Sequence, residues 1–203
     1  MKLIAVLAAS SIGVAAFAQD TAVSNETTAP VATAGLLGSR FVTTGFSWTD
    51  VNHSGVDAMS TGLSLNVPVT ANFDVSLGYG YSWAEGAIDL GHSAGATVTG
   101  YIVRGSLRPF ASASLGYVWV PNSYDKDHGV WGADVGVEYA LNDKLALTVS
   151  TGYGDDFGQH RDSTWDATVG ASYNFTAKLA GTAAVSYLEG GSVGFSAGVA
   201  FRF

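Results

Sequence analysis

The chain has 203 residues, of which 47% are hydrophobic and only 13% are charged, and its formal net charge is −8. This acidic balance and the lack of a basic patch argue against nucleic-acid binding, and the absence of cysteine excludes disulfide bonds. Beyond the N-terminal region no apolar run reaches the ~20 residues that a transmembrane helix needs, so another kind of structure must accommodate the hydrophobic surface.

The N-terminus, MKLIAVLAASSIGVAAFA, predicts a secretory signal peptide over residues 1–18. Lys2 supplies a positive charge, an apolar run follows, and small residues precede the expected cleavage site before Gln19. Residues 19–38 are rich in Thr, Ala and Ser and have no period, which predicts a flexible periplasmic N-terminal segment. A plug or a tether is the alternative for this segment. We expect residues 39–203 to form a single domain.

From Phe41 onward, large apolar residues alternate with small or polar ones, which is the period of β-strands. In FDVSLGYGYSW (73–83) the Phe, Val, Leu, Tyr and Trp side chains share one face, and Asp, Ser and Gly share the other. Ten such runs are predicted, near residues 40–49, 58–68, 72–84, 95–107, 109–120, 129–141, 144–154, 163–175, 178–188 and 192–203.

The connections between these runs alternate in length. PVTAN, LRP, LNDK and FTAK are short, whereas 50–57, 85–94, 121–128 and 155–162 are longer and polar. Tight turns at one end and longer loops at the other are typical of transmembrane barrels, and most runs have the ~9–11 residues of a tilted membrane strand. The sequence therefore predicts an all-β fold: a closed antiparallel up-and-down transmembrane β-barrel of ten strands, with eight as the alternative. A soluble β-sandwich fits less well, because the polar faces carry few Lys or Glu.

All five tryptophans fall at the long-loop ends of the predicted strands. This placement predicts an aromatic girdle at a membrane interface, formed by Trp48, Trp83, Trp119, Trp131 and Trp165.

The chain ends within a strand, GVAFRF, with Phe201 and Phe203 in its last three residues. This ending resembles the C-terminal strand signal of bacterial outer-membrane barrels. FDVSLGYGYSW, RPFASASLGYVW and GADVGVEYALNDKLALTVSTGYG look like strand–turn–strand units of small OmpA/OmpX-type barrel domains, which commonly have eight strands. The resemblance covers about residues 40–203. It implies an integral protein of a Gram-negative-type outer membrane, surrounded by lipid and lipopolysaccharide and recognised by the barrel-assembly machinery through its C-terminal strand. We expect a monomer.

The charges sort by their expected position in this barrel. The short-turn side is basic and the outer loops are acidic. Six charged residues are predicted to face the lumen, namely Asp74, Arg104, Asp134, Glu138, Asp166 and Arg202. Because a charge in a narrow interior is costly unless it is paired or hydrated, we expect Arg104 to pair with Glu138 or Asp134. If such pairs close the lumen the barrel is structural, and if water remains it is a narrow, mildly cation-preferring pore.

All four histidines lie in the expected outer loops, each with acidic neighbours. Convergence of these loops would bring imidazole and carboxylate groups together, which could bind a divalent metal ion such as Zn²⁺. The candidate ligands are His53, His92, Asp127, His128 and His160. The simpler interpretation is that polar residues accumulate in loops. Either Asp127 with His128 or Asp156 with His160 could also imitate a catalytic dyad.

We therefore expect a small, non-enzymatic outer-membrane protein with a structural or surface-interaction role in the cell envelope and without a cofactor. A narrow cation-preferring, porin-like channel is the second hypothesis. An outer-membrane enzyme with Asp and His at the barrel mouth is the third.

Overall fold

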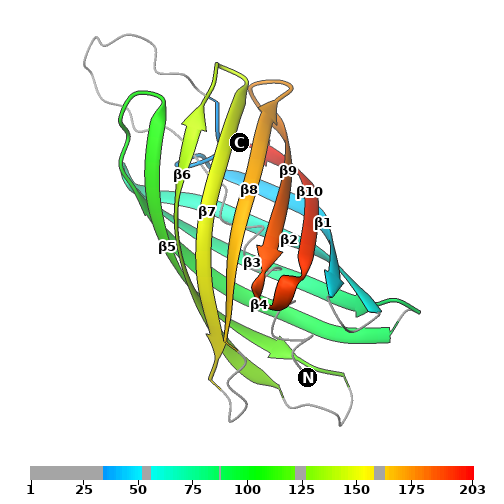
Figure 1. Ribbon diagram of the computed structural model, residues 1–203. Coiled ribbons are helices and arrows are strands. Elements are labelled where there is room, and N and C mark those ends of the chain that lie inside the picture. Colours follow the sequence, from blue (N-terminus) through cyan, green and yellow to red (C-terminus); the bar gives the residue numbers. More distant parts are fainter. Residues whose placement is uncertain (1–33, 52–55, 87, 122–126, 158–162) are drawn as a thin grey trace.

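The computed structural model describes residues 34–51, 56–86, 88–121, 127–157 and 163–203. Ten strands form a single closed sheet (Figure 1). They are β1 (Phe41–Val51), β2 (Val56–Thr70), β3 (Phe73–Ala84), β4 (Ile88–Tyr101), β5 (Leu107–Trp119), β6 (His128–Ala140), β7 (Leu145–Asp156), β8 (Thr164–Asn174), β9 (Leu179–Leu188) and β10 (Val193–Arg202), with a short 3-10 turn η1 (Glu189–Gly191) before the last strand.

Every strand pairs antiparallel with its neighbours in sequence, and β1 pairs with β10 to close the barrel, from Phe41 opposite Arg202 to Asp50 opposite Val193. The predicted closed ten-stranded up-and-down barrel is confirmed, and the eight-stranded alternative is wrong. Within the described ranges no helix is both long and apolar enough to cross a membrane. We call the end with the β2–β3, β4–β5, β6–β7 and β8–β9 connections the turn end, and the opposite end the loop end.

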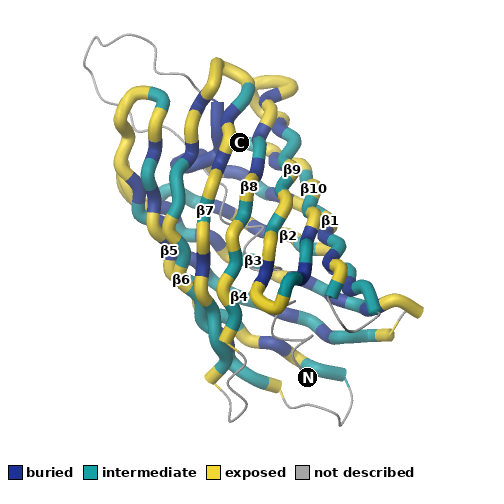
Figure 2. Tube along the Cα trace, in the orientation of Figure 1, coloured by how far each residue is buried: buried dark blue, intermediate teal, exposed yellow. Residues whose placement is uncertain are grey.

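Burial alternates along each strand, as a period of two requires (Figure 2). On β5, Ser112 is buried on the inner face, while Leu115, three residues further on the outer face, is 62% exposed. On β8, Val169 is 58% exposed in the same way. Every strand has at least one exposed large apolar residue on its outer face, most often Leu, Val, Phe or Tyr. The barrel is thus inverted relative to a water-soluble protein, because its large apolar side chains point outward and its small polar ones point inward.

The fourth strand differs from its predicted limits. It was expected over 95–107, but β4 covers Ile88–Tyr101 and the following turn covers 102–106. The polar start of β4 resembles a loop in sequence, yet it pairs with β3 as far as Ile88 opposite Ala84. The β4–β5 turn is set by Gly105, whose φ of +63° is readily adopted by glycine.

Candidate functional site in the barrel lumen

Residues 34–39, which precede β1, fold into the lumen at the turn end, and we call them the inner segment. Ala34 and Leu36 are completely buried, and Leu37 and Ser39 nearly so. Residues 34–38 were predicted to belong to the flexible periplasmic segment, so this part of the prediction is wrong. The reason is that the inner segment binds the barrel wall through both apolar and polar contacts. Residues 19–33 lie outside the described ranges, and so does the predicted signal peptide.

The apolar side chains of the inner segment pack against opposite parts of the wall. Leu36 packs with Phe41, Ala180 and Ala200, from β1, β9 and β10. In two further clusters, Leu37 packs with Tyr101 of β4 and Phe110 of β5, and Ala34 packs with Ala140 of β6 and Ala146 of β7. Phe110 faces inward and is buried in the second of these clusters. Because burying a leucine stabilises by about 1.5–3 kcal/mol, these contacts favour keeping the segment inside.

The polar contacts of the inner segment are made by its main chain. Carboxylates accept two amides: Leu36 N donates to Glu138 Oε2 at 3.0 Å and Gly38 N to Asp74 Oδ2 at 2.7 Å. The carbonyl oxygens accept from wall side chains instead, which are Arg108 Nη1 to Ala34 at 3.2 Å, Arg202 Nη2 to Gly35 at 2.7 Å and Asn66 Nδ2 to Ser39 at 2.8 Å. All of these bonds except the one from Asn66 involve a charged side chain, and charge-assisted hydrogen bonds are the stronger class.

A buried ion pair anchors this arrangement. Arg108 Nη1 lies 3.0 Å from Glu138 Oε1, and both side chains are at most 3% exposed. The predicted partner of Glu138 was Arg104, and that prediction is wrong. Arg104 is exposed in the β4–β5 turn, whereas Arg108 lies on β5 on the same face as Ser112. The other five predicted lumen charges lie on strand positions of inward parity.

A second polar group surrounds Asp74. Asn66 donates to Asp74 Oδ2 at 3.3 Å and accepts from Ser76 Oγ at 2.6 Å, and Tyr101 donates to Asp74 Oδ1 at 3.5 Å. Asn66 is completely buried. It was not predicted as a site residue, although an asparagine among lumen-facing serines on β2 was the available signal.

Gly35 permits the close approach of the inner segment to Glu138. Its φ is +104°, and a Cβ built there would overlap the Glu138 carboxylate. A side chain at this position is therefore excluded by both backbone conformation and space.

Midway along the lumen lies a different pair of carboxylates. Asp134 of β6 and Asp166 of β8 flank Gly152 of β7, and a Cβ at Gly152 would lie 2.5 Å from Asp134 Oδ1 and 2.6 Å from Asp166 Oδ1. Their partners are hydroxyl groups, with Ser112 Oγ donating to Asp134 at 2.9 Å and Thr168 Oγ1 donating to Asp166 at 3.0 Å. The described residues form no ion pair with either carboxylate.

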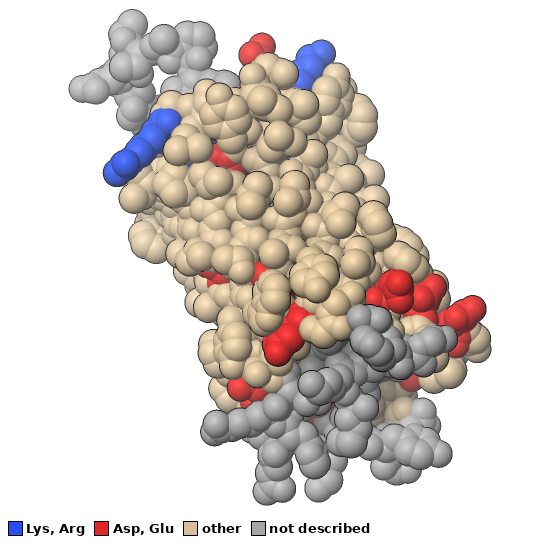
Figure 3. All heavy atoms as spheres, viewed as in Figure 1, with Lys and Arg blue, Asp and Glu red and all other residues tan. Residues whose placement is uncertain are grey.

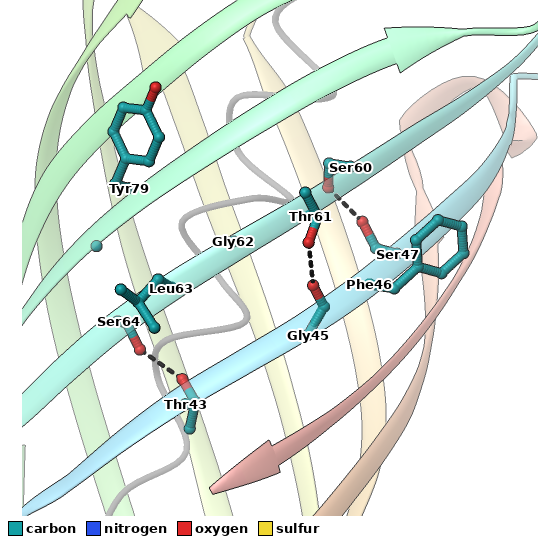
Figure 4. A pocket seen from close by; sticks show the side chains of 11 residues that line it. Thr43, Gly45, Phe46, Ser47, Ser60, Thr61, Gly62, Leu63, Ser64 and Tyr79 are labelled. Carbon is teal, nitrogen blue, oxygen red and sulfur yellow. Dashed lines mark hydrogen bonds between the residues drawn. The ribbon is translucent and has the colours of Figure 1, made fainter.

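On the other side of the barrel, the inner face of β1 and β2 is lined by hydroxyls and glycine (Figure 4). Thr43 and Ser64 share a 2.6 Å hydrogen bond, and so do Ser47 and Ser60. Gly45 and Gly62 face each other between these pairs. This part of the lumen therefore presents small polar groups.

The five tryptophans all lie at outward positions near the loop end, each beside a second aromatic ring. The pairs are Trp48–Phe195, Trp83–Tyr81, Trp119–Tyr117, Trp131–Tyr153 and Trp165–Tyr187, with ring centroids 5.2–5.9 Å apart.

The charges at the two ends are also separated. On the face shown in Figure 3, Lys and Arg lie at the turn end and most Asp and Glu lie toward the loop end. The turn-end residues are Arg40, Arg104, Lys144 and Lys178 with Asp143, and the described acidic residues near the loop end are Asp50, Asp57, Glu85, Asp89, Asp127, Asp155, Asp156 and Glu189.

The predicted metal ligands are only partly described. His53 and His160 lie outside the described residues, which contain no group of three or more potential ligands. His92 points outward on β4, and its Nδ1 shares a 2.6 Å hydrogen bond with Tyr79 Oη. His128 lies two residues before the buried Val130 on β6 and therefore on the inner side of the strand. Asp127 Oδ1 accepts from Val120 N at 3.0 Å. His92 and His128 therefore point to opposite faces of the wall.

At the C-terminus, Phe201 and Phe203 are 50% and 61% exposed. Phe203 N donates to the carbonyl of Arg40 at 3.2 Å. The predicted assembly signal is thus presented on the outer surface, next to the start of β1.

The sequence matches no family model and no curated protein. Among solved structures, the translocator domain of the autotransporter NalP from Neisseria meningitidis is 16% identical, with 81% of this chain and 88% of that chain covered and a TM-score of 0.47. The NanC porin is 13% identical, with 81% and 100% covered and a TM-score of 0.47. The N-terminal β-barrel domain of Pseudomonas aeruginosa OprF is 16% identical, with 80% and 97% covered and a TM-score of 0.41. These likenesses do not single out the OmpA/OmpX type.

Proposed function

We propose that this chain is an integral β-barrel of a Gram-negative-type outer membrane. Support comes from the exposed apolar side chains around the barrel, since such a surface is stable in lipid and not in water. The aromatic pairs near the loop end fit an interfacial girdle. In this orientation the acidic loop end faces outward beside lipopolysaccharide, and the basic turn end faces the periplasm.

The function that the lumen supports best is a non-enzymatic structural or surface-interaction role for a monomeric barrel. The observation that carries it is the inner segment, which packs against β1, β4 to β7, β9 and β10 at the turn end and hydrogen-bonds to side chains of β2 and β3. A barrel whose end is filled by its own chain is better suited to a structural or surface-interaction role in the envelope than to the diffusion of solutes. Lipid and lipopolysaccharide would be its surroundings, and the exposed Phe201 and Phe203 would be read by the barrel-assembly machinery.

Fractionation of cells that express the full chain tests this proposal. We expect the protein in the outer-membrane fraction, with faster gel migration before heating than after, because folded barrels keep their compact form in detergent. Recovery only in a soluble fraction, with no effect of heating on migration, would contradict the proposal.

A narrow cation-preferring channel is the second candidate, favoured by the position of Asp134 and Asp166 on the lumen wall without a cationic partner among the described residues. Conductance of the purified wild-type protein in a planar bilayer separates the two candidates. Steady conductance of the wild type would favour the channel, and a silent bilayer would favour the structural role. A loop metal site and a catalytic role remain predictions from the sequence.

A further inference from the structure

We propose that the inner segment is a releasable plug, and that the turn end of the lumen is a peptide-binding site which this plug occupies. When the plug leaves, the barrel conducts cations. This inference rests on the proposed membrane-spanning barrel. It adds regulated opening, which is part of neither the structural role nor a permanently open channel.

The first argument is that the plug is separate from the wall. The continuous pairing that closes the barrel runs from β1 to β10, and residues 34–39 belong to none of these strands. The plug continues directly into β1 through Arg40, which is exposed. Apart from the single β-bridge at Leu37, its departure would therefore break no backbone pairing, and the ten strands would remain a closed barrel.

The second argument is the chemistry of the contacts. Two carboxylates accept amides of the plug, and two guanidinium groups and one carboxamide donate to its carbonyls. Recognition through main-chain groups is what a peptide-binding site provides, and pockets for particular side chains add selectivity. Here Leu36 and Leu37 fill two such pockets, and the space beside Glu138 admits only glycine at position 35. The ligand class is a short peptide with the pattern Ala-Gly-Leu-Leu-Gly-Ser.

The third argument concerns what the plug leaves behind. Without it, the lumen displays four carboxylates and two guanidinium groups, from Asp74, Asp134, Glu138, Asp166, Arg108 and Arg202. The excess negative charge would favour cations. The Asp134–Asp166 pair would then contribute to cation selectivity, which has no function while the plug is in place.

Single-channel recording with full-length Gly35→Val tests the proposal. A valine at this position overlaps Glu138 and is strained at φ +104°, so it should expel the plug. We expect the wild type to be nearly silent, and the open fraction to rise by about tenfold or more in the variant, as overpacking of this kind commonly costs enough for such a change. Current through the variant should be carried mainly by K⁺ rather than Cl⁻.

The matched control is Gly105→Val, which places the same side chain on a glycine with φ +63° at the same end of the barrel, where a Cβ would meet nothing within 4 Å. This variant should remain as silent as the wild type. A second plug variant, Leu37→Asp, places a charge in the pocket of Tyr101 and Phe110 and should also conduct. Both plug substitutions lie outside the strands, so heat-modifiable migration should be unchanged.

Addition of the acetylated, amidated peptide Ala-Gly-Leu-Leu-Gly-Ser on the turn-end side should block the current of Gly35→Val, and Ala-Val-Leu-Leu-Gly-Ser should not. The proposal is overturned if Gly35→Val and Leu37→Asp insert as heat-modifiable barrels but stay silent. It is also overturned if the wild type and Gly105→Val conduct equally with them, or if both peptides act alike. Failure of the wild type itself to insert would instead refute the membrane-spanning barrel on which the inference rests.

Discussion

The turn end and the middle of the lumen both carry carboxylates, but the partners of these carboxylates differ. At the turn end, Glu138 pairs with Arg108 and accepts the amide of Leu36. In the middle, Asp134 and Asp166 have hydroxyl partners and lie on either side of the same glycine. The first region uses charge to hold a piece of chain, and the second presents charge toward the lumen.

The difference shows that charged residues in the lumen of one barrel can have different roles. A buried carboxylate that has both a guanidinium and an amide partner belongs to the packing of the protein. A carboxylate held only by hydroxyl groups keeps its charge uncompensated by a neighbouring cation and can act on whatever occupies the lumen. Substitutions of the same chemical kind should therefore have different effects in the two regions.

The largest effect is expected for Glu138→Gln. This change leaves Arg108 charged and buried without its anion, and breaking a buried pair in this way costs about 3–5 kcal/mol. We expect that loss in the free energy of unfolding, measured by urea titration of the barrel in lipid vesicles with tryptophan fluorescence. The double variant Arg108→Met/Glu138→Gln should recover part of it, and full additivity of the two single losses would rule out the coupling.

An intermediate effect is expected for Asn66→Ala. The side chain is completely buried and bonds to the plug carbonyl of Ser39, to Asp74 and to Ser76. Its removal leaves these partners unsatisfied, at about 1–3 kcal/mol. The same urea titration measures it, with Asn142→Ala in the exposed β6–β7 turn as the control. Equal, small losses for both variants would mean that Asn66 does not hold the plug.

The smallest effect is expected for Asp134→Asn, the mid-lumen counterpart of Glu138→Gln. Ser112 can still donate to the remaining oxygen, and the neighbouring Asp166 loses a like charge nearby, so stability should change by less than about 1 kcal/mol. Ion selectivity should respond instead. In a Gly35→Val background, Asp134→Asn should lower the preference for K⁺ over Cl⁻ without changing the midpoint of unfolding. A loss of stability as large as that of Glu138→Gln would erase the contrast between the two regions.

Much of the barrel could be predicted from the sequence because period two fixes both the strand and its inner face. Asp74, Asp134, Glu138 and Asp166 have inward parity in strands whose limits were nearly right. The exchange of Arg104 for Arg108 came from the misplaced β4–β5 turn. The alternation itself argued against Arg104, because within the predicted strand 95–107 it lies on the same side as Val98, which points outward, and it would have faced lipid.

The plug was only the alternative prediction for its segment, behind a flexible one. Its hydrogen bonds reach partners 102 residues away at Glu138 and 167 residues away at Arg202, and no local pattern encodes such contacts. The one local signal was the Leu36–Leu37 pair between two glycines in an otherwise small and polar segment. An apolar pair with no strand to bury it needs some other apolar environment, which the lumen supplies.

Thiol labelling of the full chain tests most directly whether the inner segment occupies the lumen of the folded barrel. The chain has no native cysteine, so Leu36→Cys, at a completely buried position, and Arg40→Cys, at an exposed one, each carry a single thiol. With a bulky, water-soluble maleimide, Arg40→Cys should react rapidly in the folded barrel. Leu36→Cys should react far more slowly there, and rapidly only after heating in detergent unfolds the barrel. Equal reaction of both thiols in the folded, heat-modifiable protein would contradict the account, because Leu36 would then lie in water rather than among Phe41, Ala180 and Ala200.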